Sequence, residues 1–166
     1  RDPFSVQIPA EFRSPKHRTF LQPAFWDGGA RMVIRFTATG AGDWDYRITS
    51  NIQRFDGMTG KIDATESETP GFVQTANVHH FRYQGNGEPH LWMGDTMYTF
   101  ATIDDGAFRA IADARAAQKF NHIRGLALGA HDNVAGIVRA PDRIDPSHFQ
   151  KLDARILYLN RKGITV

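Results

Sequence analysis

The 166-residue sequence contains no cysteine, which excludes disulfide bonds and any chemistry that depends on a thiolate. It contains no run of eighteen apolar residues, so no segment is predicted to span a membrane. It also lacks a glycine-rich phosphate loop, a Ser-His-Asp pattern and the spacing of zinc ligands. The sequence therefore predicts no cofactor and no metal site.

Neither sign of charge is in large excess. The chain has 20 basic and 18 acidic residues, mixed along its length, and a net charge of +2. This balance gives no basic patch for nucleic acid, and a hydrophobic content of 41% is typical of a globular protein. The lack of cysteine fits a reducing compartment and also many periplasmic or secreted proteins. No signal peptide is visible, and we expect a periplasmic or secreted location. The sequence predicts no oligomeric state.

Up to about residue 78 the sequence has the pattern of short strands separated by turns. Apolar and polar residues alternate in 4–12 (FSVQIPAEF) and in 43–51 (DWDYRITSN), and Asp56-Gly57 is typical of a hairpin turn. Several strands at this spacing predict an antiparallel, immunoglobulin-like β-sandwich over residues 1–78.

Three aromatic residues of this half, Trp26, Trp44 and Tyr46, could form a surface on which sugars stack. Aromatic side chains in a sandwich are more often part of the core. Trp44 and Tyr46 share one strand face with Ile48, so we predict that Trp44 is buried.

From residue 104 the apolar period becomes that of helices. Apolar residues recur at helical spacing in 104–118, after two aspartates that can cap a helix, and in 146–162, after Asp145-Pro146. Apolar strands are predicted over 91–96, 122–128 and 164–166. The order strand, helix, strand, helix, strand predicts parallel pairing through right-handed crossovers. Because a parallel sheet needs both faces covered, we expect the chain to be a piece of a larger protein, with the missing part downstream and a little upstream.

Two sets of residues resemble a known family. The second half resembles the opening of the apiosidase-like catalytic barrel, a glycoside-hydrolase family, in PHLWMGDTMYTF (89–100), ADARAAQKFNHIRG (112–125) and DPSHFQKLDARILYLNRKGITV (145–166). The first half resembles the β-sandwich before such barrels in DPFSV (2–6), PAFWDGG (23–29), RFTATGAGDWDY (35–46) and DGMTG (56–60). The order of these motifs is more specific than any one of them. Lys119 departs from the pattern, which commonly has glycine there.

The resemblance implies a β-sandwich followed by the first βα units of a (β/α)8 TIM barrel, incomplete in this chain, over residues 79–166. It implies a hydrolase of plant or microbial polysaccharide with a carbohydrate substrate. The catalytic carboxylate pair of such barrels sits on later strands, so we expect no catalytic residue in this chain. Whether hydrolysis retains or inverts configuration is not encoded in this segment. The alternative is a non-catalytic carbohydrate-binding or scaffold module.

Asp95 raises the question of why an acidic residue ends an apolar strand. In a β/α barrel the C-terminal ends of the strands carry the site, so Asp95 could accept hydrogen bonds from sugar hydroxyls. Tyr98 or Trp92 could then stack on a sugar ring. Alternatively, Asp95 caps a turn and Tyr98 packs in the core.

Ile123 and Arg124 fall on opposite faces of the predicted strand, so if Ile123 faces the helices, Arg124 points into the barrel. A buried guanidinium needs a carboxylate partner. That partner is either Asp95 on the neighbouring strand, in a purely structural pair, or an acid on a later strand whose pKa the arginine would lower.

His131 and Asp132 follow the second predicted strand and could bind substrate from its rim, or they could be ordinary loop residues. The adjacent pair His79-His80 points to opposite faces of a strand, so a shared metal ion is not expected. The candidate substrate-binding residues are thus Asp95, Tyr98, Arg124, His131 and Asp132.

Overall fold

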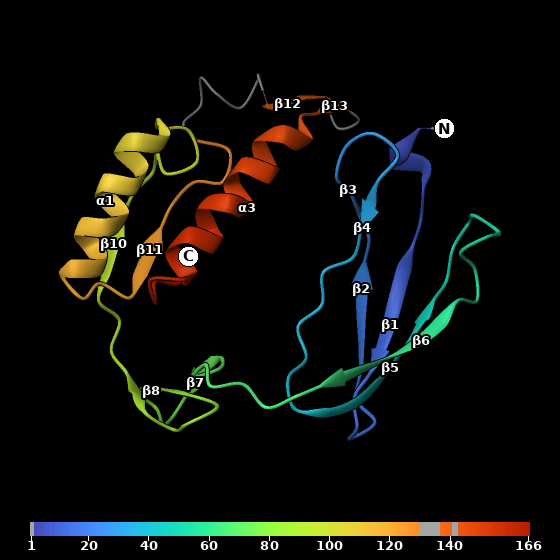
Figure 1. The fold of residues 1–166 in the computed structure, drawn as a ribbon, viewed down its shortest axis with the longest axis horizontal. Coiled ribbons are helices and arrows are strands. Elements are labelled where there is room, and N and C mark those ends of the chain that lie inside the picture. Colours follow the sequence, from blue (N-terminus) through green and yellow to red (C-terminus); the bar gives the residue numbers. More distant parts are fainter. Residues whose placement is uncertain (1, 130–136, 141–142) are drawn as a thin grey trace. The chain divides into compact units, whose positions relative to one another are not determined.

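The computed structural model describes residues 2–129, 137–140 and 143–166 (Figure 1). The chain forms two compact units. The first comprises the chain up to Phe72 together with Tyr83–Gly87, and the second comprises Val73–Arg82 together with Glu88–Val166. Each unit has its own hydrophobic core, and each is therefore described by itself.

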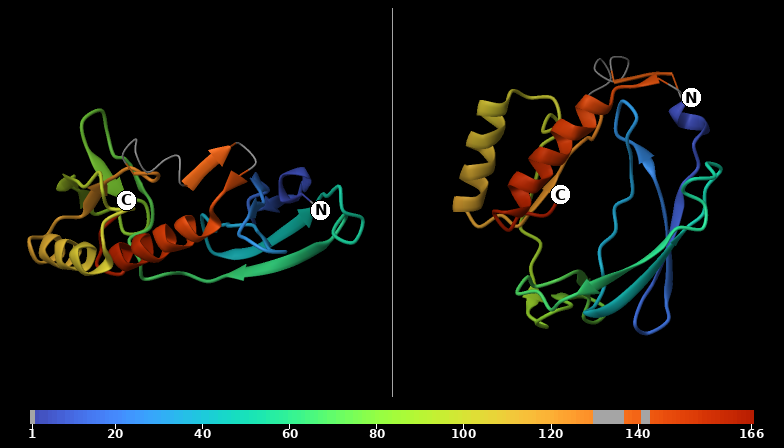
Figure 2. Two further views of the ribbon diagram at one scale, coloured as in Figure 1. Left: turned by 90° about the horizontal axis from the view of Figure 1, so that it is seen from above. Right: turned by 45° about the vertical axis from the view of Figure 1, so that its right-hand side comes forward.

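The first unit is built on a four-stranded antiparallel sheet with the order β2-β1-β5-β6. Its strands are β1 (Pro9–Arg13), β2 (Thr19–Pro23), β5 (Gly42–Ile48) and β6 (Thr59–Ala64). These strands are labelled in Figure 1, and Figure 2 gives two further views of the fold. Buried and exposed side chains alternate along β1 and β5, as expected for strands with one face on a core. The unit also contains a hairpin of β3 (Phe25–Trp26) and β4 (Met32–Val33).

Trp44 lies at the centre of this unit's core and is 1% exposed. Its indole Nε1 donates to the carbonyl oxygen of Gly40 at 3.0 Å, which satisfies the polar atom that burial takes from water. The predicted burial of Trp44 is confirmed. Tyr46 packs over Gly60, where any side chain would clash with the phenol ring. These two aromatics belong to the core, whereas Trp26 is half-buried and lines a cavity.

The strand predicted over residues 4–12 is only partly correct. Residues Pro3–Ser5 form a short 3-10 helix, η1, and the strand begins at Pro9. The carboxylate of Asp2 accepts the backbone N–H of Phe4 at 3.0 Å. This local capping bond satisfies a backbone donor that a strand would have to pair with a neighbour, so the first residues turn instead.

The second unit contains helices α1 (Asp105–Ala117) and α3 (Pro146–Asn160), close to the helices that apolar spacing predicts. Strands β10 (Gly94–Thr96) and β11 (His122–Arg124) flank α1 in the sequence and pair in parallel. The two helices pack against these strands through Phe108, Ile123, Leu152 and Leu159. Within the described residues, no helix is long and apolar enough to cross a membrane.

The remaining strands are short. Strands β7 (Val73–Thr75), β8 (Phe81–Tyr83) and β9 (Pro89–His90) form a three-stranded sheet in that order. Strands β12 (Val138–Ala140) and β13 (Arg143–Ile144) form an antiparallel pair with an irregular register. These additions make the described part of the chain mainly β-structure in small sheets.

The predicted fold class is wrong in its second part. The described residues form mostly small antiparallel sheets with two α-helices, and no βα units of a TIM barrel are seen. The parallel pair β10–β11 is only three residues long. Beside it, His122 and Thr165 form an isolated parallel bridge. Apolar periodicity identifies helices and strands one at a time, but strand closure into a barrel is a long-range property that it does not encode. The β-rich fold is consistent with the predicted sandwich.

Candidate functional site

The parallel pair β10–β11 carries two of the residues that the sequence singles out, Asp95 and Arg124. Asp95 lies opposite Ile123, and Thr96 lies opposite Arg124. Ile123 is fully buried in the helical core, which fixes the helix-facing side of β11. Because side chains alternate along a strand, Thr96 and Arg124 project from the face that α1 does not cover.

Asp95 faces helix α1 and is paired there. Its Oδ2 lies 2.6 Å from Nε of Arg115, and its Oδ1 accepts the backbone N–H of Thr96 at 2.8 Å. The side chains of Asp95 and Arg115 are 30% and 32% exposed, so the pair is half-buried. The carboxylate therefore joins the end of β10 to α1. The alternative pairing of Asp95 with Arg124 does not form.

Arg115 occupies the last turn of α1, and its position depends on how that helix ends. The backbone N–H of Phe120 donates to the carbonyl of Arg115, and that of Lys119 donates to Ala116, both at 3.0 Å. This pattern is a Schellman motif, which requires a left-handed residue after the cap. Lys119 takes that conformation with φ of 66°. The Arg115 guanidinium then stacks on Phe120 at 5.1 Å from the ring centroid.

Arg124 is exposed, so the argument that burial forces a carboxylate partner on it does not apply. Its guanidinium carbon lies 6.0 Å from the centroid of the Tyr98 ring, at the limit for a cation–π contact. Tyr98 is 52% exposed. The structure thus brings Tyr98 and Arg124 together on the open face of the strand pair, with Asp95 on the opposite face.

Trp92 precedes β10 and is held by three ring contacts. Its ring lies 5.6 Å from Phe81, 4.6 Å from His90 and 4.8 Å from His122, and each pair is close to perpendicular. Perpendicular contacts of this kind are favourable and fix the orientation of the indole. Trp92 is nevertheless 45% exposed, so part of its surface is available to a ligand.

His122 is a site residue that sequence reasoning missed. It lies two residues before Arg124, so strict alternation along β11 would have placed both on one face. Its Nδ1 is 3.1 Å from the hydroxyl of Thr165. A side chain on Gly94 would come within 3.3 Å of the His122 ring, so the glycine leaves room beside the imidazole.

His90 adds a titratable group next to this cluster. It is 6% exposed, and burial lowers the pKa of its imidazole, with a smaller contribution from the nearby charge of His122. Both effects disfavour the protonated ring.

Asn121 joins the segments that carry the site. Its side-chain amide donates to the carbonyl of Leu91 and accepts the N–H of Met93. Its own carbonyl accepts both the N–H and the hydroxyl of Thr165. One residue therefore aligns the starts of β10 and β11 with the C-terminal segment, which sets the spacing of Trp92 and His122.

The loop that carries Tyr98 is held by a buried arginine. Arg155 of α3 is 3% exposed, and its guanidinium donates to the carbonyls of Phe100 and Ile103 and to the carboxylate of Asp105. Its two terminal nitrogens make these three hydrogen bonds, and bonds of this kind offset the cost of burying a guanidinium. Arg155 therefore fixes the loop between β10 and α1 against the second helix.

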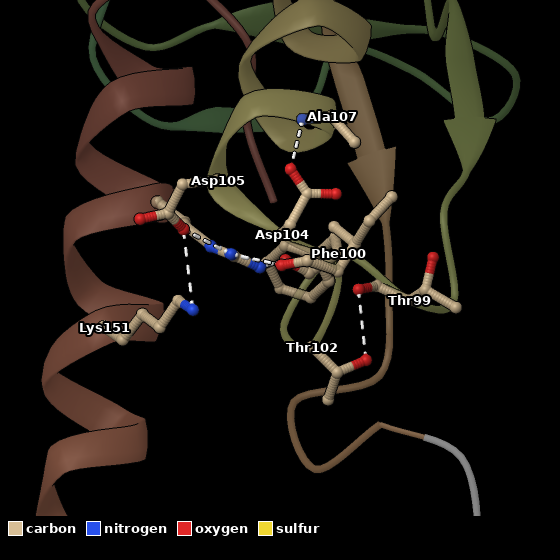
Figure 3. Close-up of polar contacts among 9 residues, drawn as sticks. Thr99, Phe100, Thr102, Asp104, Asp105, Ala107 and Lys151 are labelled. Carbon is tan, nitrogen blue, oxygen red and sulfur yellow. Dashed lines mark hydrogen bonds and ion pairs between the residues drawn. The ribbon is translucent and has the colours of Figure 1, made fainter.

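The start of α1 completes this arrangement (Figure 3). Asp104 caps the helix by accepting the N–H of Ala107 at 2.9 Å, and Lys151 lies 3.5 Å from Asp105. The hydrogen bond from Arg155 is the largest cause that holds the pKa of Asp105 below its usual value, and Lys151 contributes further. The cap and the ion pairs connect the start of α1, which follows the Tyr98 loop, to α3.

The other candidates do not join this site. His131 and Asp132 lie outside the described residues. Asn77 accepts the N–H groups of His79 and His80 and contacts the His80 ring, so these exposed histidines shape a turn. No group of residues suited to a metal ion is found in the part of the chain that is described.

Comparison with known proteins relates the chain to one domain family and one solved structure. Residues 1–51 match a domain of unknown function, DUF5060. Over 99% of its length the chain is similar, with a TM-score of 0.83 and 26% sequence identity, to the crystal structure of "a putative glycoside hydrolase from Bacteroides vulgatus ATCC 8482". The chain covers 36% of that protein, about a third of its length. No curated protein matches the chain.

Proposed function

We propose that this chain is part of a glycoside hydrolase and that it contributes to binding the carbohydrate substrate. The observation that carries the proposal is the similarity of nearly the whole chain, at a TM-score of 0.83, to the Bacteroides vulgatus protein. At 26% identity this similarity supports a related role as well as a related fold. The catalytic carboxylate pair is proposed to lie outside these 166 residues.

The geometry of the open strand face supports carbohydrate binding. Tyr98 and Trp92 are 52% and 45% exposed, and a sugar can lay its C–H face on an exposed aromatic ring. Arg124 beside Tyr98 and His122 beside Trp92 supply groups that can hydrogen-bond to sugar hydroxyls. Asp95 acts from the other face, where its bond to Arg115 holds the strand end that carries Thr96.

The finer assignment that we propose is to the apiosidase-like group, acting on a plant or microbial polysaccharide in the periplasm or outside the cell. The support is the ordered set of motifs around Gly94-Asp95-Thr96, Phe120-Asn121 and Asp145-Pro146. The structure gives two of these motifs a physical role. Asn121 aligns three segments, and Asp145 accepts the N–H of Ser147 at the start of α3.

Isothermal titration calorimetry of the 166-residue chain with a panel of plant and microbial oligosaccharides tests the proposal. Tyr98→Ala should weaken binding of a recognised sugar about tenfold, roughly 1.4 kcal/mol, because a stacking surface is lost. Phe72→Ala is the matched control, since Phe72 is 48% exposed and lies in the other unit. Equal losses in the two variants, or no binding of any sugar, would argue against this face as the site.

The alternative is a binding or scaffold module without catalysis. Hydrolysis assays on a longer natural protein that contains this chain separate the two functions. Turnover by the longer protein, and none by the isolated 166 residues, is the result expected for a hydrolase whose acids lie elsewhere. Sugar binding with no turnover in either protein would favour the module.

A further inference from the structure

The first unit contains a cavity of about 700 Å³ that the proposed carbohydrate site does not use. It lies among η1, the β3–β4 hairpin and the loop that joins β5 to β6. Its walls are mainly aliphatic and aromatic, including Ile8, Ala24, Trp26, Ile34, Ile48 and Ile52. A cavity of this size with largely apolar walls is typical of small-molecule sites.

Trp26 is held in a fixed orientation at this cavity. Its indole Nε1 donates to the carbonyl of Gly29 at 3.0 Å, and Phe4 packs edge-on against it at 5.8 Å. Gly28 and Gly29 take φ of 94° and 55°, values that favour glycine, so the turn after Trp26 depends on both. The aromatic wall is therefore formed before any ligand arrives, which lowers the entropic cost of binding.

Two arginines, Arg31 and Arg54, line the cavity, and they differ in their partners. Arg54 stacks on Phe55, which also lines the cavity, with its guanidinium carbon 4.4 Å from the ring centroid. Arg31 is paired with Asp27, whose Oδ2 lies 3.3 Å from its Nε and whose side chain is only 12% exposed, so its charge is already balanced. No acidic residue is among the described residues that line the cavity. The exposed guanidinium of Arg54 is thus the one that an anion in the cavity can use.

We propose that this cavity binds a small carboxylic acid with an apolar ring or branched chain. The apolar part would occupy the space beside Trp26 and Ile34, and the carboxylate would accept hydrogen bonds from Arg54. A guanidinium suits a carboxylate because its N–H groups match the two oxygens. A sugar fits less well, because its hydroxyls would lose water against walls that offer few hydrogen bonds.

Calorimetry on the 166-residue chain at low salt tests this site with 3-phenylpropionate as the probe. Two comparison ligands separate its features: 3-phenylpropan-1-ol lacks the charge, and glucuronate lacks the apolar ring. We expect saturable binding of one 3-phenylpropionate per chain, at least tenfold tighter than either comparison ligand. Equal affinity for the acid and the alcohol would overturn the role of Arg54.

Two variants locate the binding. Arg54→Gln should weaken binding of 3-phenylpropionate about tenfold or more, because a charge-assisted hydrogen bond is lost. Ala24→Leu should weaken binding by narrowing the cavity, with thermal melting used to check the fold. Arg13→Gln is the matched control, since Arg13 is exposed on β1 and does not line the cavity. Unchanged binding in both Arg54→Gln and Ala24→Leu, or the absence of saturable binding, would overturn the proposal. A dimer in sedimentation equilibrium that excludes the probe would assign the cavity to a second copy instead.

Discussion

Nε of Arg115 lies 2.6 Å from Oδ2 of Asp95, and this contact explains the acidic residue at the end of an apolar strand. The carboxylate turns toward α1 and leaves Arg124 on the other face beside Tyr98. Asp95 therefore links β10 to α1. Tyr98 and Arg124, and not Asp95, lie on the face that we propose for sugar binding.

Removing this link should lower stability by a small, measurable amount. Arg115→Met is expected to cost about 1–2 kcal/mol, because a half-buried, charge-assisted hydrogen bond to Asp95 is lost. Urea unfolding of Arg115→Met, Asp95→Asn and the double variant measures the coupling between the two side chains. Arg161→Met, on the exposed Arg161 next to α3, serves as the control. Fully additive effects would mean that the contact contributes nothing to stability.

Lys119 offers a stabilising substitution. Its φ of 66° is a conformation that costs a residue with a side chain about 1–2 kcal/mol, whereas glycine takes it freely. Lys119→Gly should therefore stabilise the protein by about 0.5–1 kcal/mol after the entropy of the unfolded glycine is subtracted. Gln118→Gly is the control, because Gln118 has φ of −78° and gains nothing. The thermal midpoint should rise in the first variant and fall in the second.

Arg155→Met should be far more destabilising than a surface change. It leaves the carbonyls of Phe100 and Ile103 without their donor, at an expected cost of about 2–4 kcal/mol. Lys151→Met, which removes the weaker partner of Asp105, is the matched control. Denaturant unfolding near neutral pH should separate the two variants clearly, and similar losses would show that burial of Arg155 is unimportant.

Asp105 makes part of this contribution dependent on pH. Because its pKa is lowered in the folded protein, its stabilising effect is present above the usual value of 3.8 and is lost as pH falls through the lower folded value. Stability of the parent chain should therefore drop in this acid range. The drop should be smaller in Arg155→Met, which lacks the main cause of the shift.

His90 should produce a pH dependence in a different range. The pKa of His90 in the folded protein lies below the usual 6.5. As pH falls below 6.5, the unfolded chain therefore binds a proton at His90 before the folded chain does. The stabilising effect is complete above pH 6.5 and declines as pH falls toward the folded pKa. His90→Gln should flatten the decline in unfolding free energy between about pH 7 and 5. His79→Gln, at an exposed position, should leave it unchanged. Parallel profiles for all three proteins would exclude this role for His90.

Arg124 provides the sharpest test of the proposed function. In a longer active protein that contains this chain, Arg124→Met should reduce kcat/KM about tenfold to a thousandfold, roughly 1.4–4 kcal/mol of transition-state stabilisation. Arg161→Met is the control, because Arg161 is exposed beside α3. Both variants are checked by thermal melting. Near-normal activity in Arg124→Met would remove Arg124 from the substrate site.

Local features of this protein follow from the sequence. Asp104 and Asp145 cap the two predicted helices, and Trp44 is buried as alternation along its strand predicts. Capping and periodicity act between residues a few positions apart, so they are visible in the order of the amino acids. The resembled pattern commonly has glycine at position 119. The φ of 66° that Lys119 takes there is a conformation that favours glycine, which explains this preference.

The partners of the charged residues were decided by the tertiary structure. Asp95 binds Arg115, 20 positions away, and Arg155 binds backbone carbonyls more than 50 positions away. Many arginines in the sequence could have filled either role, because charge alone does not specify a partner. Only the packing of α1 and α3 against β11 brings one guanidinium within hydrogen-bond distance of each acceptor. For the same reason the sequence did not predict the small, mostly antiparallel sheets, since strand pairing depends on contacts between distant segments that periodicity does not contain.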